Sequence, residues 1–199
     1  WIGGVMDQRD PAKFILGAEE SYGFLIGEHA RDKDAAVASM ILAELTARAK
    51  AAGLSLHEKL DALFRTYGCH AERTISVKMP GAEGMDRMKA VMAQFRESPP
   101  ASLAGIEVSQ VRDYLNQTLT PTGRDPRPLA GPRGDLVMLD LAAAGNYVAV
   151  RPSGTEPKVK FYMFAYDPAE ASQDLATTKD NQRKRLAAMQ KDLEAFAGV

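Results

Sequence analysis

The spacing of the apolar residues changes near residue 70, and this change limits the folds open to the chain. From residue 34 to 67 apolar side chains recur every three or four positions, as in helices, whereas residues 74–79 alternate as in a half-buried strand. The chain is therefore predicted to divide into two domains, residues 1–70 and 71–199.

The first part carries two helix-start signals. Asp32 or Asp34 is a suitable N-cap for a helix that ends at Gly53. Ser55, followed three positions later by Glu58, forms a capping box and predicts the start of a second helix. Short apolar runs before these helices predict two strands around a turn, at 14–16 and 24–26.

The second part mixes strand and helix patterns and is predicted to be an α+β domain with mostly antiparallel strands. The expected strands lie at 74–79, 106–111, 136–141, 147–150 and 159–164, and the expected helices at 85–95 and 186–196. Residues 116–135 hold many prolines and glycines, so this stretch is predicted to be a long loop.

Composition excludes several classes of protein. With 45% hydrophobic and 26% charged residues the chain is that of a globular protein, and a net charge of −1 gives it no overall attraction to nucleic acid or to an anionic membrane. No apolar run approaches the roughly 20 residues of a membrane span, and no signal peptide is visible, so we predict a cytoplasmic location. The single cysteine, Cys69, cannot form an intramolecular disulfide and lies in no zinc-binding pattern.

The octet R-P-S-G-T-E-P-K at residues 151–158 lies between two predicted strands and has the groups that a phosphate requires. Arg151 can bind two phosphate oxygens at once, and the hydroxyls of Ser153 and Thr155 can donate to the others. Gly154 would let the backbone approach the ligand closely. The alternative is a hairpin turn in which Ser153 and Thr155 bond only to their own backbone.

The segment Glu19-Glu20-Ser21 is suited to a polyol. In an extended segment the side chains of Glu19 and Ser21 point to the same side, where a carboxylate and a hydroxyl can bind neighbouring sugar hydroxyls. The alternative is a solvated acidic turn.

A basic cluster precedes the first long helix. His29, Arg31 and Lys33 lie next to the free amides of the helix start and could bind a second anion. Alternatively, Asp32 and Asp34 cap the helix and neutralise Arg31 and Lys33.

Three segments resemble motifs of the α-D-phosphohexomutase family, in particular its phosphoglucomutase and phosphomannomutase branch. They are E-E-S-Y-G-F at 19–24, A-R-D-K-D at 30–34 and the octet at 151–158, which is similar to the family's phosphate-binding loop. The resemblance implies the C-terminal part of a Rossmann-like α/β/α third domain over residues 1–70. A complete α+β fourth domain with a mostly antiparallel sheet would follow over residues 71–199.

The resemblance also implies a reaction. Members of this family interconvert hexose 1-phosphates and hexose 6-phosphates through an enzyme phosphoserine and a hexose 1,6-bisphosphate intermediate. By this resemblance the sugar hydroxyls would be bound by Glu19 and Ser21, the phosphate that is not transferred by Arg151, Ser153, Gly154, Thr155 and Lys158, and the reacting end by Lys33, His29 and Arg31.

The family's catalytic motifs are missing from the 199 residues. Neither the T-A-S-H-N-type loop with the serine nucleophile nor the D-G-D-type loop that binds Mg²⁺ occurs. We therefore expect an inactive fragment that binds a phosphorylated hexose and packs against its own N-terminal domains. Trp1 as the first residue is consistent with a trypsin-like cut, the alternative being a deliberate truncation.

Two other interpretations compete with a mutase. One is a non-catalytic module that binds phosphorylated sugars or other anions. The other, RNA binding through Arg124, Arg127 and Arg133 or through a G-x-x-G loop at 81–84, is disfavoured because the chain has no basic face and Glu83 would repel the nucleic-acid backbone.

Overall fold

The computed structural model describes residues 2–19, 23–28, 31–172 and 174–198. The chain separates into two compact units, Trp1–Ala62 and Leu63–Val199. The division falls within helix α3 (Leu56–Tyr67), a few residues before the change in apolar spacing.

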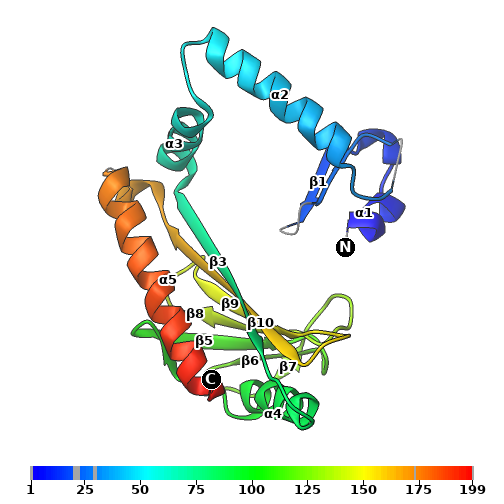
Figure 1. Cartoon of the computed structure of the whole chain (residues 1–199), viewed down its shortest axis with the longest axis vertical. Helices are drawn as coiled ribbons and strands as arrows, with labels where there is room; N and C mark the ends of the chain where they lie inside the picture. Colours follow the sequence, from blue (N-terminus) through cyan, green and yellow to red (C-terminus); the bar gives the residue numbers. More distant parts are fainter. Residues whose placement is uncertain (1, 20–22, 29–30, 173, 199) are drawn as a thin grey trace. The chain divides into compact units, whose positions relative to one another are not determined.

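The first unit is built around a two-stranded antiparallel hairpin in which Glu19 pairs with Gly23 (Figure 1). Its elements, in chain order, are α1 (Ile2–Gln8), the 3-10 turn η1 (Pro11–Lys13), β1 (Leu16–Glu19), β2 (Gly23–Ile26), α2 (Ala35–Ala51) and the start of α3. The strand expected at 14–16 begins only at Leu16, and α1 was not expected, because its Gly-Gly start is a poor helix signal.

Both predicted helix starts are confirmed. The Oδ1 atom of Asp34 accepts hydrogen bonds from the backbone N–H groups of Ala36 and Val37, at 2.9 and 3.2 Å, so Asp34 caps α2. At α3 the Ser55 N–H donates to Glu58 Oε2 (2.7 Å), and the Glu58 N–H donates to Ser55 Oγ (3.2 Å). This reciprocal pair is a capping box.

The first unit leaves much apolar surface exposed. Among its described residues the buried apolar side chains are Met6, Leu25 and Ala49. Apolar side chains at helical spacing on α2 are open to solvent, since Met40 is 62% exposed and Leu45 is 42% exposed. Burial of such a surface would contribute on the order of 25 cal/mol per Å², so the unit has a face suited to a packing partner.

The second unit contains a fully antiparallel sheet, eight-stranded in the described residues, with the order β3-β10-β9-β8-β5-β6-β7 and β4 paired to β5 (Figure 1). Its strands are β3 (Cys69–Lys78), β4 (Ser102–Leu103), β5 (Ile106–Asp113), β6 (Thr118–Pro121), β7 (Arg127–Pro128), β8 (Val137–Leu141), β9 (Tyr147–Pro152) and β10 (Lys158–Asp167). Its other elements are α4 (Gly84–Glu97), the 3-10 turn η2 (Ala169–Ala171) and α5 (Leu175–Ala197).

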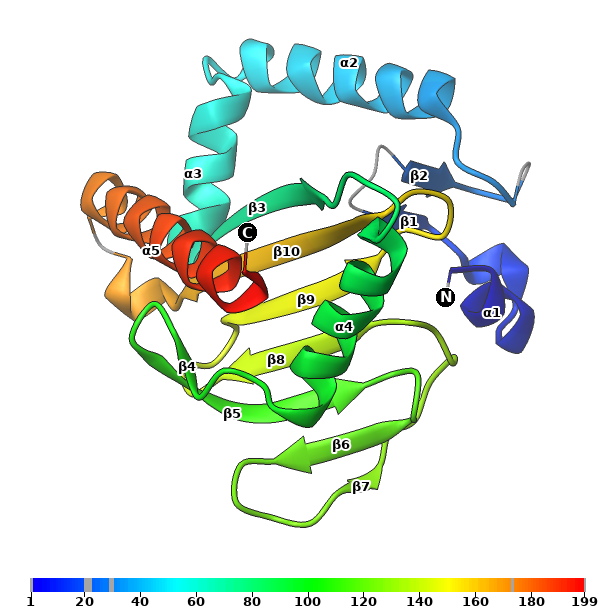
Figure 2. The ribbon, with the colours of Figure 1, turned by 60° about the horizontal axis from the view of Figure 1, so that its bottom comes forward.

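Both helices of this unit cover the same face of the sheet, as Figure 2 shows for α4 and α5. Alternate residues of β10 are buried beneath them, and Phe161 packs against Phe95 of α4 with ring centroids 5.8 Å apart. Phe95 also contacts Phe196 of α5, at 4.7 Å. The methionine stripe of α4, with Met88 and Met92 buried, is part of this core. Among the described residues of this unit, no helix packs on the opposite face of the sheet.

Residues 116–135 are not the long loop that their composition suggested. Part of the stretch forms the short strands β6 and β7, and Pro121 pairs with Gln110 at the last position of β6. A proline at the end of a strand near the sheet edge loses little, because its missing N–H is not needed there. The expectation of a loop was therefore wrong for residues 118–121 and 127–128, whereas the other residues of the stretch lie in turns and irregular segments.

Candidate functional site

The octet at 151–158 forms the end of β9, the connecting loop and the start of β10. The Ser153 N–H donates to the Lys158 carbonyl (2.9 Å), and the Lys158 N–H donates to the Glu156 carbonyl (2.8 Å). The N–H of Met79, just after β3, donates to the Pro157 carbonyl at 2.8 Å. These bonds fix the base of the loop to three adjacent strands.

Arg151 lies directly opposite Lys160 in the β9–β10 ladder. Their neighbours Val150 and Phe161 are fully buried under the helices, so by strand alternation Arg151 and Lys160 point to the uncovered face. Arg151 is exposed, and neither cationic side chain forms a hydrogen bond or ion pair with another described residue. Lys160 lies outside the octet, and only the strand register places it beside Arg151.

The polar groups of the loop are partly engaged with each other. The Thr155 N–H donates to Ser153 Oγ over a long 3.5 Å, and the Lys158 ammonium pairs with Glu156 at 3.2 Å. A Cβ added to Gly154 would meet nothing within 4 Å, so packing does not require glycine there. The hydrogen bond between Thr155 and Ser153 is the kind that the alternative interpretation, a hairpin turn, expects. Arg151 and Lys160 nevertheless have no partner among the described residues. The assignment of the octet to phosphate binding therefore stays a prediction.

In the first unit, Glu19 and Lys33 form an ion pair. The Lys33 ammonium lies 2.9 Å from Glu19 Oε1, and both side chains are half-exposed. Gly23 makes this contact possible, because a Cβ there would lie 2.3 Å from Glu19 Cγ and 2.5 Å from Lys33 Cδ. Glu19, Lys33 and Arg31 line one pocket of about 570 Å³.

At the start of α2 the helix cap of the alternative interpretation is present, and both basic side chains form ion pairs. Arg31 pairs with Asp7 of α1, and Lys33 pairs with Glu19, while Asp34 caps the helix. The remaining predicted residues of this part, Ser21 and His29, lie outside the described residues.

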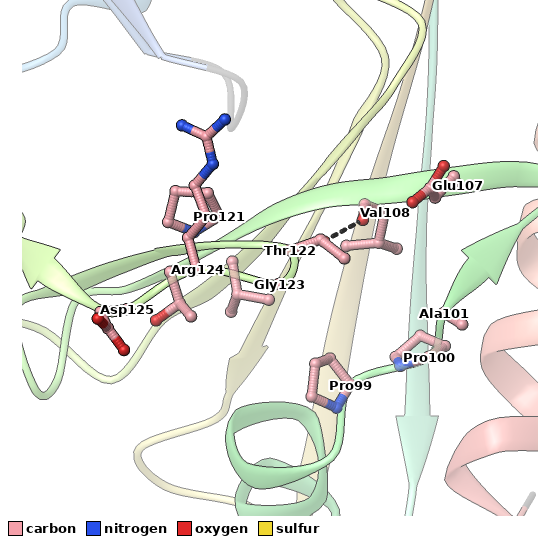
Figure 3. A pocket seen from close by; sticks show the side chains of 12 residues that line it. Pro99, Pro100, Ala101, Glu107, Val108, Pro121, Thr122, Gly123, Arg124 and Asp125 are labelled. Carbon is pink, nitrogen blue, oxygen red and sulfur yellow. Dashed lines mark hydrogen bonds between the residues drawn. The ribbon is translucent and has the colours of Figure 1, made fainter.

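A larger pocket of about 740 Å³ lies elsewhere in the second unit, between the end of α4 and the β5–β6 region (Figure 3). Pro99, Pro100 and Pro121 line it, and the Thr122 hydroxyl donates to the Val108 carbonyl at its wall (2.6 Å). None of its lining residues belongs to the predicted site, although an arginine, Arg124, is one of them.

The part of the chain that the structure describes contains no group of three or more His, Cys, Asp or Glu side chains able to hold a metal ion. Cys69 is fully buried, and its Sγ lies 3.3 Å from Gln182 Oε1. In these same residues no helix is both long and apolar enough to cross a membrane.

Comparison with known proteins agrees with the motifs. Residues 1–67 match the family model for phosphoglucomutase/phosphomannomutase, alpha/beta/alpha domain III. Two curated relatives, the phosphoglucomutases of Staphylococcus aureus strains USA300 and MRSA252, are 33% and 32% identical to this chain over 155 residues. Each match covers 77% of this chain and 28% of the relative, so the chain spans 28% of the length of these relatives.

A solved structure has a similar fold. It is the crystal structure of the exocytosis-sensitive phosphoprotein pp63/parafusin, a phosphoglucomutase from Paramecium, in its open form. The TM-score is 0.58 at 17% identity, and the match covers 99% of this chain and 33% of that one. The expected fold class is thus confirmed: a third-domain α/β/α part followed by a fourth domain with an antiparallel sheet. Residues 1–67 therefore belong to the phosphoglucomutase/phosphomannomutase family as its alpha/beta/alpha domain III, and the chain as a whole is similar to phosphoglucomutases.

Proposed function

We propose that this chain is the sugar-phosphate-binding part of a phosphohexomutase, an enzyme that interconverts hexose 1-phosphate and hexose 6-phosphate through a phosphoserine and a bisphosphorylated intermediate. The observation that carries the proposal is the exposed, unpaired Arg151 opposite Lys160, at the base of a loop with two hydroxyls. Two adjacent cations on an open sheet face are stabilised by a bound dianion.

In this proposal the octet binds the phosphate that is not transferred. Arg151 donates two parallel hydrogen bonds, Ser153 and Thr155 donate their hydroxyls, and the backbone at Gly154 has room for the ligand. Lys158 contributes charge once it turns from Glu156, its partner at 3.2 Å. Anchoring the remote phosphate supplies binding energy that orients the reacting one.

The hairpin of the first unit binds the sugar. Glu19 accepts hydrogen bonds from hydroxyls, and its pair with Lys33 holds the carboxylate in position while one oxygen stays available. Ser21, His29 and Arg31 keep the roles that the family resemblance gives them. Replacing Glu19 by alanine should lower sugar discrimination and leave phosphate affinity nearly unchanged, because in this proposal Glu19 contacts the hydroxyls of the substrate and not its phosphate.

The serine nucleophile and the Mg²⁺ must come from other parts of the enzyme. Among the described residues no three suitable metal ligands lie together, so in this proposal another part of the enzyme holds the Mg²⁺. The resemblance implies that Mg²⁺ assists phosphoryl transfer. Because neither the serine motif nor the D-G-D motif occurs in these 199 residues, we expect the chain by itself to be inactive. The exposed apolar side chains of the first unit, such as Ile15 at 82%, suit packing against the enzyme's own N-terminal domains. From the sequence analysis we propose that the enzyme is cytoplasmic.

Calorimetric titration of the chain with glucose 6-phosphate, inorganic phosphate and glucose tests the proposal. Arg151→Ala should weaken glucose 6-phosphate and phosphate ten- to a hundredfold, the effect of losing about 1.5–3 kcal/mol from a charged hydrogen bond. Arg124→Ala, which removes an arginine from the larger pocket, is the matched control and should bind as the wild type does. Equal affinities in all three proteins would reject the proposal.

A non-catalytic module that binds phosphorylated sugars is the second candidate, because the described residues offer anion-binding groups without a nucleophile motif. Residues encoded upstream decide between the two. A serine loop and a D-G-D loop there, with mutase activity of the longer protein, would establish the enzyme.

A further inference from the structure

The two edges of the antiparallel sheet differ in how far they are protected. At one edge β7 has two residues and ends in Pro128, so it offers almost nothing to another strand. At the other edge β3 has ten residues with neither proline nor glycine. In the part of the chain that the structure describes, no strand pairs with its outer side.

The hydrogen-bond phase of β3 shows which backbone groups face outward. The Met79 N–H donates to the Pro157 carbonyl, so the odd-numbered residues of β3 exchange hydrogen bonds with β10 in the recorded register. The even-numbered residues therefore direct their N–H and C=O groups away from the sheet. These residues are His70, Glu72, Thr74, Ser76 and Lys78, and their side chains are all exposed.

We propose that β3 is a self-association edge, on which a second copy of this chain pairs antiparallel about a two-fold axis at Ile75. In this register Thr74 lies opposite Ser76 of the copy, and Glu72 lies opposite Lys78. At all of these positions the backbone N–H and C=O groups point away from β10, so the two β3 strands form a continuous hydrogen-bonded ladder. The axis is perpendicular to the sheet, which keeps the helix-covered faces of both copies on the same side.

Charge selects this register over its neighbours. With the axis at Ile75, Glu72 and Lys78 form two oppositely charged pairs, one at each end of the interface. Axes at Thr74 or Ser76 put Lys78 opposite His70 or Thr74 instead. An axis at Arg73 puts two arginines directly opposite each other, which is unfavourable. Because these charges are exposed, they fix the register more than they add affinity, which comes from the backbone hydrogen bonds.

Sedimentation equilibrium of the chain tests the edge. The wild type should show a concentration-dependent average mass that rises toward twice that of one chain. Thr74→Pro should stay monomeric, because proline has no backbone N–H to donate to the second copy and its ring blocks the approach of that strand. The hydrogen bonds between β3 and β10 do not involve the Thr74 N–H and stay in place. Thr74→Ala, which keeps the N–H, is the control and should dimerise like the wild type. Circular dichroism checks that each variant is folded.

The register is tested by a charge exchange that does not involve proline. Glu72→Lys and Lys78→Glu should each weaken the dimer about tenfold, since each creates two like-charged pairs. The double variant should restore wild-type association. A wild type that stays monomeric at all concentrations, or a dimer that survives Thr74→Pro because it uses another surface, overturns the proposal. Failure of the double variant to recover overturns the register.

Discussion

Arg151 and Lys160 lie directly opposite each other in neighbouring antiparallel strands, with no carboxylate among the described residues to pair with either side chain. Like charges at directly opposed positions destabilise a sheet. The arrangement therefore costs stability in the free protein and favours the binding of an anion.

Replacing Lys160 by glutamine should show both effects. The unliganded variant should melt at a slightly higher temperature than the wild type, because the repulsion with Arg151 is gone. Inorganic phosphate should raise its melting temperature less than it raises that of the wild type. Lys191→Gln, an exposed position on α5, should change neither quantity. Equal phosphate-induced shifts in Lys160→Gln and the wild type would exclude Lys160 from the anion site.

Asp113 should be a strong contributor to the stability of the second unit. It is 6% exposed and accepts hydrogen bonds from the Leu115 N–H (2.9 Å), the Asn116 amide (2.6 Å) and Arg96 (3.3 Å). Asp113→Ala leaves the largely buried Arg96 with only its more exposed partner, so unfolding in urea should become easier by about 3–5 kcal/mol. That second partner, Asp135, is half-exposed, and Asp135→Ala should cost less than about 1 kcal/mol. Similar losses in both variants would contradict this assignment.

Gly68 connects α3 to β3 in a conformation that other residues adopt poorly. Its φ is +97°, and a Cβ would lie 2.5 Å from a ring carbon of Tyr166 and 2.7 Å from the Asp167 carbonyl. Gly68→Ala should therefore lower the free energy of unfolding by about 1–3 kcal/mol or more. Gly53 also has a positive φ, +73°, but has open space around it. Gly53→Ala should be the milder change in the same denaturation experiment, and the reverse order would refute the steric argument.

The capping box of α3 should be visible in a pH titration. The backbone N–H and the hydroxyl of Ser55 hydrogen-bond to the Glu58 carboxylate, and they hold the pKa of Glu58 below its ordinary value. A lowered pKa in the folded state stabilises it above the unfolded pKa, and this contribution is lost as the pH falls through the folded pKa. Carbon NMR of the Glu58 carboxyl should give a low midpoint in the wild type and a higher one in Ser55→Ala. Identical midpoints would mean that the box does not form in solution.

The sequence patterns predicted local features such as helix starts, where only a few residue types can supply the hydrogen bonds needed. Asp34 and Ser55 mark the starts of α2 and α3 because few side chains can bond to free helix amides. The hairpin between β8 and β9 was predicted from two apolar runs joined by the turn residues Ala144-Gly145-Asn146. The first half of α5 was missed, because its buried positions include Thr178 and Gln182, which interrupt the apolar stripe.

For a similar reason, the candidate site could be predicted only in part from the sequence. The octet has its own sequence signature, but the position of Lys160 depends on the register of two strands, which no local pattern specifies. The ion pair between Glu19 and Lys33 depends on the absence of a side chain at Gly23. No local sequence pattern predicts that these three residues meet. Residues that become neighbours through strand pairing, or because a nearby glycine has no side chain, can be identified only in the folded structure.

The hydrogen bond from Met79 to Pro157 has a consequence for the entropy of ligand binding. The base of the octet loop is held by β3, β9 and β10, and Gly84 at the start of α4 lies so close that a Cβ there would meet Pro157 at 3.1 Å. Within the loop, Gly154 and Thr155 at the tip take no part in these backbone hydrogen bonds. A ligand therefore has few backbone torsions to immobilise, and most of the interaction energy of the bound phosphate appears as affinity.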